Sequence, residues 1–211
     1  MAKKEKKNGM NLPNKITCAR LVLAVMVLII LCIPWQALGV SWPRFAIKGF
    51  AQDIDLKFIV SGVLFAIGSF TDFLDGHIAR KYNLVTDFGK VMDAIADKVL
   101  VNGVLIMLAY ENFIPVIIPV IIISRDIAVD SLKMVAGSKK GAVAASWPGK
   151  VKTICMMIGV SLVFIYNIPF AFIGNNVVRV DLALVYIATI LSVVSGCLYF
   201  NSYKDVVFSE M

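Results

Sequence analysis

Four aspartates stand at regular spacing within two strongly apolar stretches of this chain. They are Asp72, Asp75, Asp93 and Asp97, in the pattern D-x-x-D-G-x-x-A-R, eight residues, G-x-x-x-D-x-x-x-D. Spacings of three and four residues place each pair on one face of a helix. A carboxylate at bilayer depth costs roughly 2.5–3.5 kcal/mol. We therefore expect a cation to compensate the four charges.

The predicted donor set consists of carboxylate oxygens, without histidine or cysteine. Such donors suit a hard cation, Mg²⁺ or Mn²⁺, and Ca²⁺ would also fit. Two such ions lying close together can clamp a phosphoryl group. The aspartates therefore predict a two-ion site for phosphoryl chemistry. The alternative is that they only pair with Arg80, Lys90 and Lys98.

The composition indicates a membrane protein. Of 211 residues, 59% are hydrophobic and 17% are charged, which is too apolar for an ordinary soluble domain. Crossing a bilayer takes about 20 helical residues. We predict an all-α integral membrane fold with a basic tail and short interfacial segment (1–15), a six-helix transmembrane domain (16–203) and a C-terminal tail (204–211). Six stretches are long enough to span: Ile16–Trp35, Leu56–Lys81, Phe88–Tyr110, Phe113–Val135, Val151–Tyr166 and Leu182–Tyr203.

The positive charges predict the orientation of these spans. Of 21 Lys and Arg residues, only Arg44, Lys48, Lys57 and Arg179 fall in the outer loops, so both termini are expected in the cytoplasm. The aspartates then lie in the cytoplasmic half, facing each other from two antiparallel helices. The net charge of +7 indicates membrane lipid and anionic ligands. Nucleic acid is a poor alternative, because no soluble domain presents a basic face.

A cation transporter is the alternative from a different functional class. It predicts carboxylates spread through the depth of the membrane and helices broken at the midplane. The four aspartates instead cluster towards one end of their helices, and the two glycines of the pattern stand between the two pairs. This pattern favours an enzyme over a transporter.

From Asp72 to Asp97 the chain resembles the CDP-alcohol phosphatidyltransferase family, whose signature it matches at every fixed position. The resemblance implies a six-helix membrane enzyme, usually a homodimer, that transfers the phosphatidyl group of a CDP-linked lipid to an alcohol and releases CMP. It implies that Asp72, Asp75 and Asp93 hold the metal pair. Asp97 would be a further ligand and the general base.

The same resemblance implies a site for the CDP-linked lipid on the other signature residues. Arg80 would contact the diphosphate. The site would be lined by Gly76, Ala79, Arg80 and Gly89.

Three further segments are similar to the branch of the family whose acceptor is glycerol 3-phosphate. They are residues 11–20 (NLPNKITCAR), 85–90 (VTDFGK) and 149–153 (GKVKT). Two positions depart from that branch: Ala94 stands where proline is usual, and Asp126 where glutamate is expected. The predicted reaction takes CDP-diacylglycerol and glycerol 3-phosphate to phosphatidylglycerophosphate and CMP. Inositol phosphate or serine remains the alternative acceptor.

Basic residues in the cytoplasmic halves of the spans favour a phosphorylated acceptor. A buried arginine such as Arg125 needs an anion, and its planar guanidinium can bind phosphate through two parallel bonds. The adjacent Asp126 need not be its partner, because neighbouring helix residues do not face each other. The predicted acceptor-phosphate site consists of Arg125, Lys150, Lys152, Arg20 and Thr17.

Overall fold

The computed structural model describes residues 11–46, 53–82, 86–140, 147–168, 170 and 179–207. Within its helices, the side chains of residues 12, 73, 75, 77–81, 87, 90, 138–140 and 205–207 are not described. The described chain contains six long helices: α1 (Leu12–Cys32), α2 (Leu56–Lys81), α3 (Asp87–Tyr110), α4 (Ile117–Lys140), α5 (Trp147–Phe164) and α6 (Val180–Val207). Between α1 and α2 lie a short 3₁₀ helix, η1 (Trp35–Leu38), and two antiparallel strands, β1 (Arg44–Phe45) and β2 (Ile54–Asp55).

The prediction of an all-helical fold with six long helices is confirmed, and α2 has the predicted bounds. The start of α4 was predicted too early, because the helix begins at Ile117 rather than Phe113. Asn112 adopts a positive φ of 63°, which ends the preceding helical path. Pro115 has no N–H to donate, and its carbonyl instead accepts the N–H of Ile118 at 3.0 Å.

The first helix begins earlier than the predicted span, at Leu12 rather than Ile16, and the interfacial position of residues 11–15 stays a prediction. Residues from Leu12 onwards form the first turn of α1 without a break. The Lys15 N–H already donates to the Asn11 carbonyl at 3.1 Å. Pro13 fits this turn because the first N–H groups of a helix have no acceptor within it.

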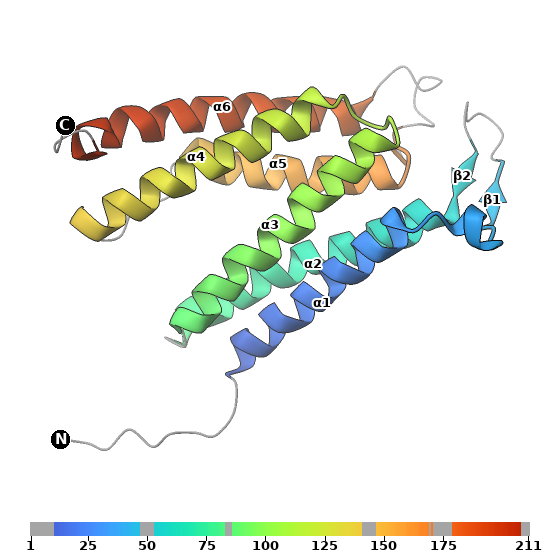
Figure 1. The fold of residues 1–211 in the computed structure, drawn as a ribbon, viewed down its shortest axis with the longest axis horizontal. Coiled ribbons are helices and arrows are strands. Elements are labelled where there is room, and N and C mark those ends of the chain that lie inside the picture. The colour runs from blue at the N-terminus through green and yellow to red at the C-terminus, as the bar shows by residue number, and fades with distance from the viewer. Residues whose placement is uncertain are drawn as a thin grey trace.

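The six helices form two groups of three (Figure 1). In the first, α1 packs along both α2 and α3, which contact each other less. In the second, α4 and α5 both pack on α6. Contacts of α2 with α5 and of α3 with α4 join the groups. The start of α1, the end of α2, the start of α3 and the end of α6 lie at one end, and the two strands lie at the other.

A continuous apolar core connects the two groups near the middle of the helices. Phe65, Val104, Ile122 and Val160 are fully buried in it. At Gly62 of α2, a Cβ would lie 2.5 Å from the Cβ of Phe164, so the missing side chain lets α2 and α5 meet closely. Small residues at such contacts let membrane helices pack where lipid is as apolar as the side chains.

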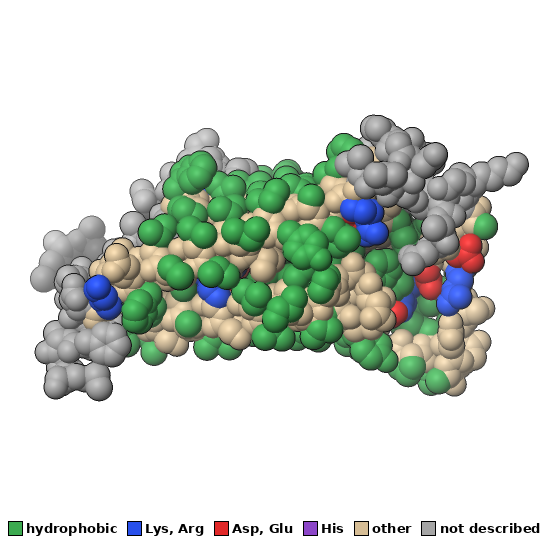
Figure 2. Space-filling model, turned by 90° about the horizontal axis from the view of Figure 1, so that it is seen from above, with side chains coloured by type: hydrophobic (Ala, Val, Ile, Leu, Met, Phe, Trp, Pro, Cys, Tyr) green, Lys and Arg blue, Asp and Glu red, His purple; other side chains and the backbone are tan. Residues whose placement is uncertain are grey.

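The outer surface is also apolar. Figure 2 shows hydrophobic side chains over most of one face, with charged groups gathered towards its ends. Among the described residues, three helices are long and apolar enough to cross a membrane: Pro13–Cys32, Trp147–Phe164 and Val180–Lys204. The other three helices carry more charged residues, including the four aspartates. The surface and these spans indicate a membrane protein.

Candidate active site

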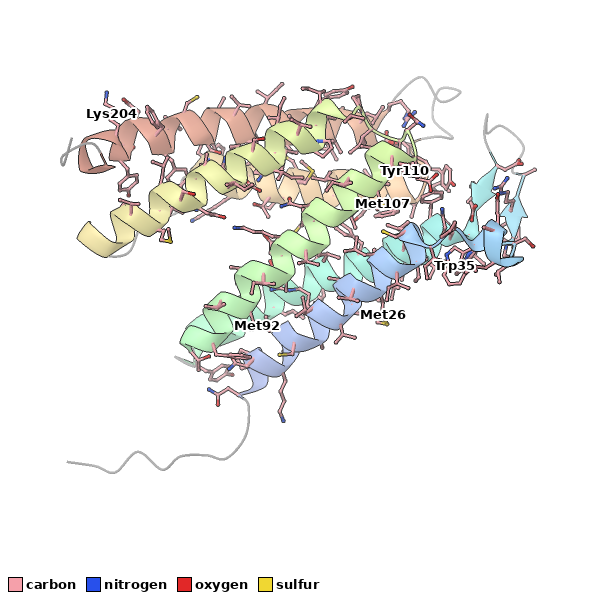
Figure 3. All side chains as sticks on the ribbon, in the orientation of Figure 1. Met26, Trp35, Met92, Met107, Tyr110 and Lys204 are labelled. Atoms are coloured by element: carbon pink, nitrogen blue, oxygen red, sulfur yellow. The ribbon has the colours of Figure 1, made fainter. Side chains whose placement is uncertain are left out.

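The aspartate signature lies on α2 and α3, towards the turn that joins them. Asp72 is on α2, and Asp93 and Asp97 are on α3. In Figure 3, Met92 marks this end of α3, whereas Met107 and Tyr110 lie at the opposite end near the strands. The described signature aspartates therefore cluster towards one end of the bundle.

Arg20 of α1 connects the two arms of the signature. Its Nη1 forms an ion pair with Asp72, and its Nη2 forms one with Asp93. Nη2 also lies 3.4 Å from the Asp93 carbonyl oxygen. The Arg20 side chain is buried, whereas the side chains of Asp72 and Asp93 are 29% and 52% exposed, so both carboxylates also reach the surface. This contact follows from the position of α1, which packs on both α2 and α3.

In the structure, Arg20 therefore pairs with these two aspartates, whereas the sequence analysis predicted that it binds the acceptor phosphate. One buried guanidinium compensates two partly exposed carboxylates. Asp72 and Asp93 thus converge from separate helices on one positive group. That convergence fits a site for a hard cation with oxygen ligands.

The structure describes three of the four predicted metal ligands, since the side chain of Asp75 lies outside the described residues. Among the described side chains, no three acidic, His or Cys groups gather closely enough to hold a metal ion. The metal site therefore stays a prediction. The side chains of Ala79 and Arg80 are likewise not described, and Gly76 lies in the same part of α2.

The start of α3 is tied to the start of α1 by a polar contact. The Thr86 hydroxyl caps α3 by accepting the Gly89 N–H at 3.0 Å, and it also accepts the Asn14 side-chain amide at 3.0 Å. A Cβ at Gly89 would lie 2.6 Å from Asn14 Oδ1. The signature glycine therefore makes room for α1 against α3, in addition to the CDP-lipid contact predicted for it.

A second charged cluster joins α4 and α5. The Lys152 Nζ lies 2.8 and 3.1 Å from the two carboxylate oxygens of Asp126, and Arg125 Nη1 donates to Asp126 Oδ1 at 2.9 Å. Asp126 is thus a partner of Arg125 after all, because the long arginine side chain folds back to its neighbour. Lys152 is only 9% exposed. The structure brings together two of the predicted acceptor residues.

Helix α6 supplies contacts to this cluster that the sequence analysis missed. Arg125 Nε donates to the Ser192 carbonyl at 3.0 Å, and Nη2 donates to the Ser195 hydroxyl at 2.6 Å. The available signal was the S-x-x-S-G sequence of residues 192–196, the most polar stretch in the middle of an otherwise apolar helix.

Asp97 is within electrostatic range of both clusters. The charges of Arg20 and Asp93 act on it from the first cluster, and those of Lys152 and Asp126 from the second. The residue predicted to be the general base is thus within range of one predicted metal ligand, Asp93, and one predicted acceptor cation, Lys152.

The remaining predicted residues lie apart from these clusters or have other partners. The Thr17 hydroxyl donates to the Pro13 carbonyl at 3.1 Å, within α1. Lys150 is exposed in the first turn of α5. Lys98 pairs with Asp130 of α4 rather than with a signature aspartate.

A cleft of about 1240 Å³ lies at the opposite end of the bundle, beside η1 and β1. It contains two ion pairs, Arg44–Asp55 at 3.6 Å and Lys57–Glu111 at 2.9 Å. None of the signature residues lines it. The reactive groups are therefore assigned to the aspartate end, despite the size of this cleft.

Comparison with known proteins gives the same assignment as the signature. A sequence profile of the CDP-alcohol phosphatidyltransferase family matches residues 10–195. A CDP-diacylglycerol–glycerol-3-phosphate 3-phosphatidyltransferase of Bacillus subtilis is 40% identical over 90% of this chain and 94% of its own length. A protein of the same name from Rickettsia bellii is 34% identical over 92% of this chain and 96% of its own length. One from Mycoplasma genitalium is 37% identical over 70% of this chain and 61% of its own length. The chain belongs to the CDP-alcohol phosphatidyltransferase family.

Proposed function

We propose that this protein transfers the phosphatidyl group of CDP-diacylglycerol to glycerol 3-phosphate, giving phosphatidylglycerophosphate and CMP. The relatives that carry the name of this activity cover most of the chain. The observation that carries the proposal is that two charged clusters, Arg20–Asp72–Asp93 and Arg125–Asp126–Lys152, lie on the helices that surround Asp97, with Arg20, Asp93, Lys152 and Asp126 within electrostatic range of it. Those are the two groups that the reaction has to bring together.

Each part of the site has a distinct task in this reaction. Asp97 accepts the proton of the glycerol 3-phosphate hydroxyl, whose oxygen then bonds to the lipid-side phosphorus. The bond from that phosphorus to the bridging diphosphate oxygen breaks, and CMP leaves. Gly76, Ala79 and Arg80 hold the CDP group, and Arg125 and Lys152 hold the acceptor phosphate.

The reaction is proposed to depend on Mg²⁺ or Mn²⁺. Asp72, Asp75, Asp93 and Asp97 would hold a pair of ions, which when bound polarise phosphoryl oxygens and stabilise the charge of the departing CMP. Arg20 would remain close by and limit the repulsion between Asp72 and Asp93.

The two cations that meet at Asp126, Arg125 and Lys152, favour a phosphorylated acceptor over serine, which carries no phosphate. A guanidinium has five N–H donors, and the three bonds of Arg125 leave one on each terminal nitrogen. These two can bind an anion together. Inositol phosphate offers the same group, so the names of the relatives favour glycerol 3-phosphate between the two.

The proposed setting is the cytoplasmic membrane, crossed by all six helices, with both termini and the opening of the site on the cytoplasmic side. The start of α1 and the end of α6 lie at the same end of the bundle as the end of α2 and the start of α3 (Figure 1). Positively charged residues are few in the loops of the opposite end. A homodimer is proposed from the family resemblance.

Substitution of the acceptor-site arginine is expected to act on one substrate only. Arg125→Ala should raise the KM for glycerol 3-phosphate about ten- to a hundredfold, because a bond from a charged donor contributes roughly 1.5–3 kcal/mol. The KM for CDP-diacylglycerol should change little. Steady-state CMP release, with each substrate varied in turn, measures both constants.

Arg80→Ala is the matched control and should show the reverse pattern, because Arg80 belongs to the CDP signature. Equal impairment of both substrates by both variants would contradict the division of the site.

A further inference from the structure

The side chain of Arg125 lies along α6 at the point where that helix has no side chain of its own. A Cβ added at Gly196 would lie 3.1 Å from Arg125 Cγ and 3.5 Å from its Nε. A contact of 3.1 Å is tighter than most Cβ contacts, so Arg125 would have to move by a few tenths of an ångström. Gly196 therefore sets how closely the arginine approaches α6.

Two polar groups of the same turn fix the direction of the guanidinium. The Ser192 carbonyl accepts from Nε at 3.0 Å, and the Ser195 hydroxyl accepts from Nη2 at 2.6 Å. The Ser195 hydroxyl is itself oriented, because it donates to the Ser192 carbonyl at 3.0 Å. Both serines are fully buried. These bonds fix the plane of the guanidinium. They come from α6, which carries none of the predicted substrate ligands.

The third contact of Arg125, with Asp126, cannot by itself fix this orientation. Asp126 belongs to the same helix and also holds Lys152, from α5. The groups that fix the position of Arg125 relative to another helix therefore belong to α6. Its Nη1 and Nη2 each retain one N–H, which is the pair that an anion would use.

We propose that the segment Ser192–Gly196 of α6 is a positioning element, which orients Arg125 to bind the phosphate of the acceptor. The inference rests on the proposed acceptor site. It adds Ser195 and Gly196, which are not among the predicted substrate ligands, to the residues that determine acceptor affinity. Positioning matters at this scale because a displacement of about 1 Å can change a rate by about a hundredfold.

The test compares Gly196→Ala and Ser195→Ala with the wild-type protein. Each variant is expected to raise the KM for glycerol 3-phosphate about three- to tenfold, from a displacement well below 1 Å, and to leave the KM for CDP-diacylglycerol unchanged. Gly137→Ala of α4 is the control, because a Cβ there meets nothing within 4 Å. It should leave both constants within twofold of wild type.

A double-mutant cycle separates positioning from a general effect on the fold. In an Arg125→Ala background, Gly196→Ala and Ser195→Ala should no longer change the kcat/KM for glycerol 3-phosphate, since the side chain they orient is gone. An effect of unchanged size in that background would overturn the proposal. So would single variants whose KM for glycerol 3-phosphate stays within twofold of wild type.

The same cycle distinguishes this inference from the function on which it rests. If Arg125→Ala raises the KM for glycerol 3-phosphate and the α6 variants do not, only the role of α6 is wrong. If Arg125→Ala itself has no effect on that KM, the acceptor site is wrong and the inference fails with it.

Discussion

Asparagine in place of Asp97 is expected to lower kcat by about 10²–10⁴-fold, the usual contribution of a general base. Asparagine keeps the shape of the side chain but cannot accept the proton of the acceptor hydroxyl. CDP-diacylglycerol does not need that proton transfer to bind, so its binding should survive in part. The measurements are kcat from CMP release and the affinity for CDP-diacylglycerol from calorimetry in detergent.

The other signature aspartates serve as the comparison for Asp97. Asp72→Asn, Asp75→Asn and Asp93→Asn should abolish turnover and also weaken metal binding. Glu111→Gln, at the opposite end of the bundle, should leave turnover within a few-fold of wild type. Near-normal turnover of Asp97→Asn would show that another group is the base.

Chelation of divalent cations is expected to abolish turnover, and Mg²⁺ or Mn²⁺ should restore it. The reason is that every proposed ligand is a carboxylate oxygen. The loss should be reversible, because the ion pairs of Arg20 with Asp72 and Asp93 join α1 to α2 and α3. CMP release before and after EDTA treatment measures activity, and the thermal unfolding midpoint shows whether the protein stays folded.

Binding of Mn²⁺ followed by electron paramagnetic resonance gives a second readout that does not depend on activity. Asp93→Asn should bind Mn²⁺ more weakly than wild type. Full turnover in excess chelator would contradict the metal-dependent mechanism.

The helices and the position of the signature aspartates towards one end of them could be predicted from the sequence, because both depend on local patterns. The bounds of α2 follow from one long apolar run, and the faces of Asp72 and Asp93 follow from helical spacing. The two ion-pair partners of Arg20 could not be predicted from the sequence. Spacing gives the face of a helix but does not reveal that α1 packs on both α2 and α3.

The cluster of Arg125, Asp126 and Lys152 also has contacts that helical spacing does not predict. The charge pattern identified Arg125 and Lys152, but Asp126 was set aside because adjacent residues point in different directions on a helix. The flexible arginine side chain overrides that rule by folding back. The contribution of Ser195 and Gly196 depends on the packing of α4 against α6, which connects residues about 70 positions apart.

The measurement that most directly tests the proposed function is an acceptor panel with the purified protein, CDP-diacylglycerol and Mg²⁺ or Mn²⁺. CMP release and the lipid product are followed with glycerol 3-phosphate, inositol phosphate, serine or glycerol as the only acceptor. Glycerol 3-phosphate should support rapid CMP release and formation of phosphatidylglycerophosphate, and the other three should support little. Equal turnover with glycerol or serine, or turnover with inositol phosphate alone, would contradict it.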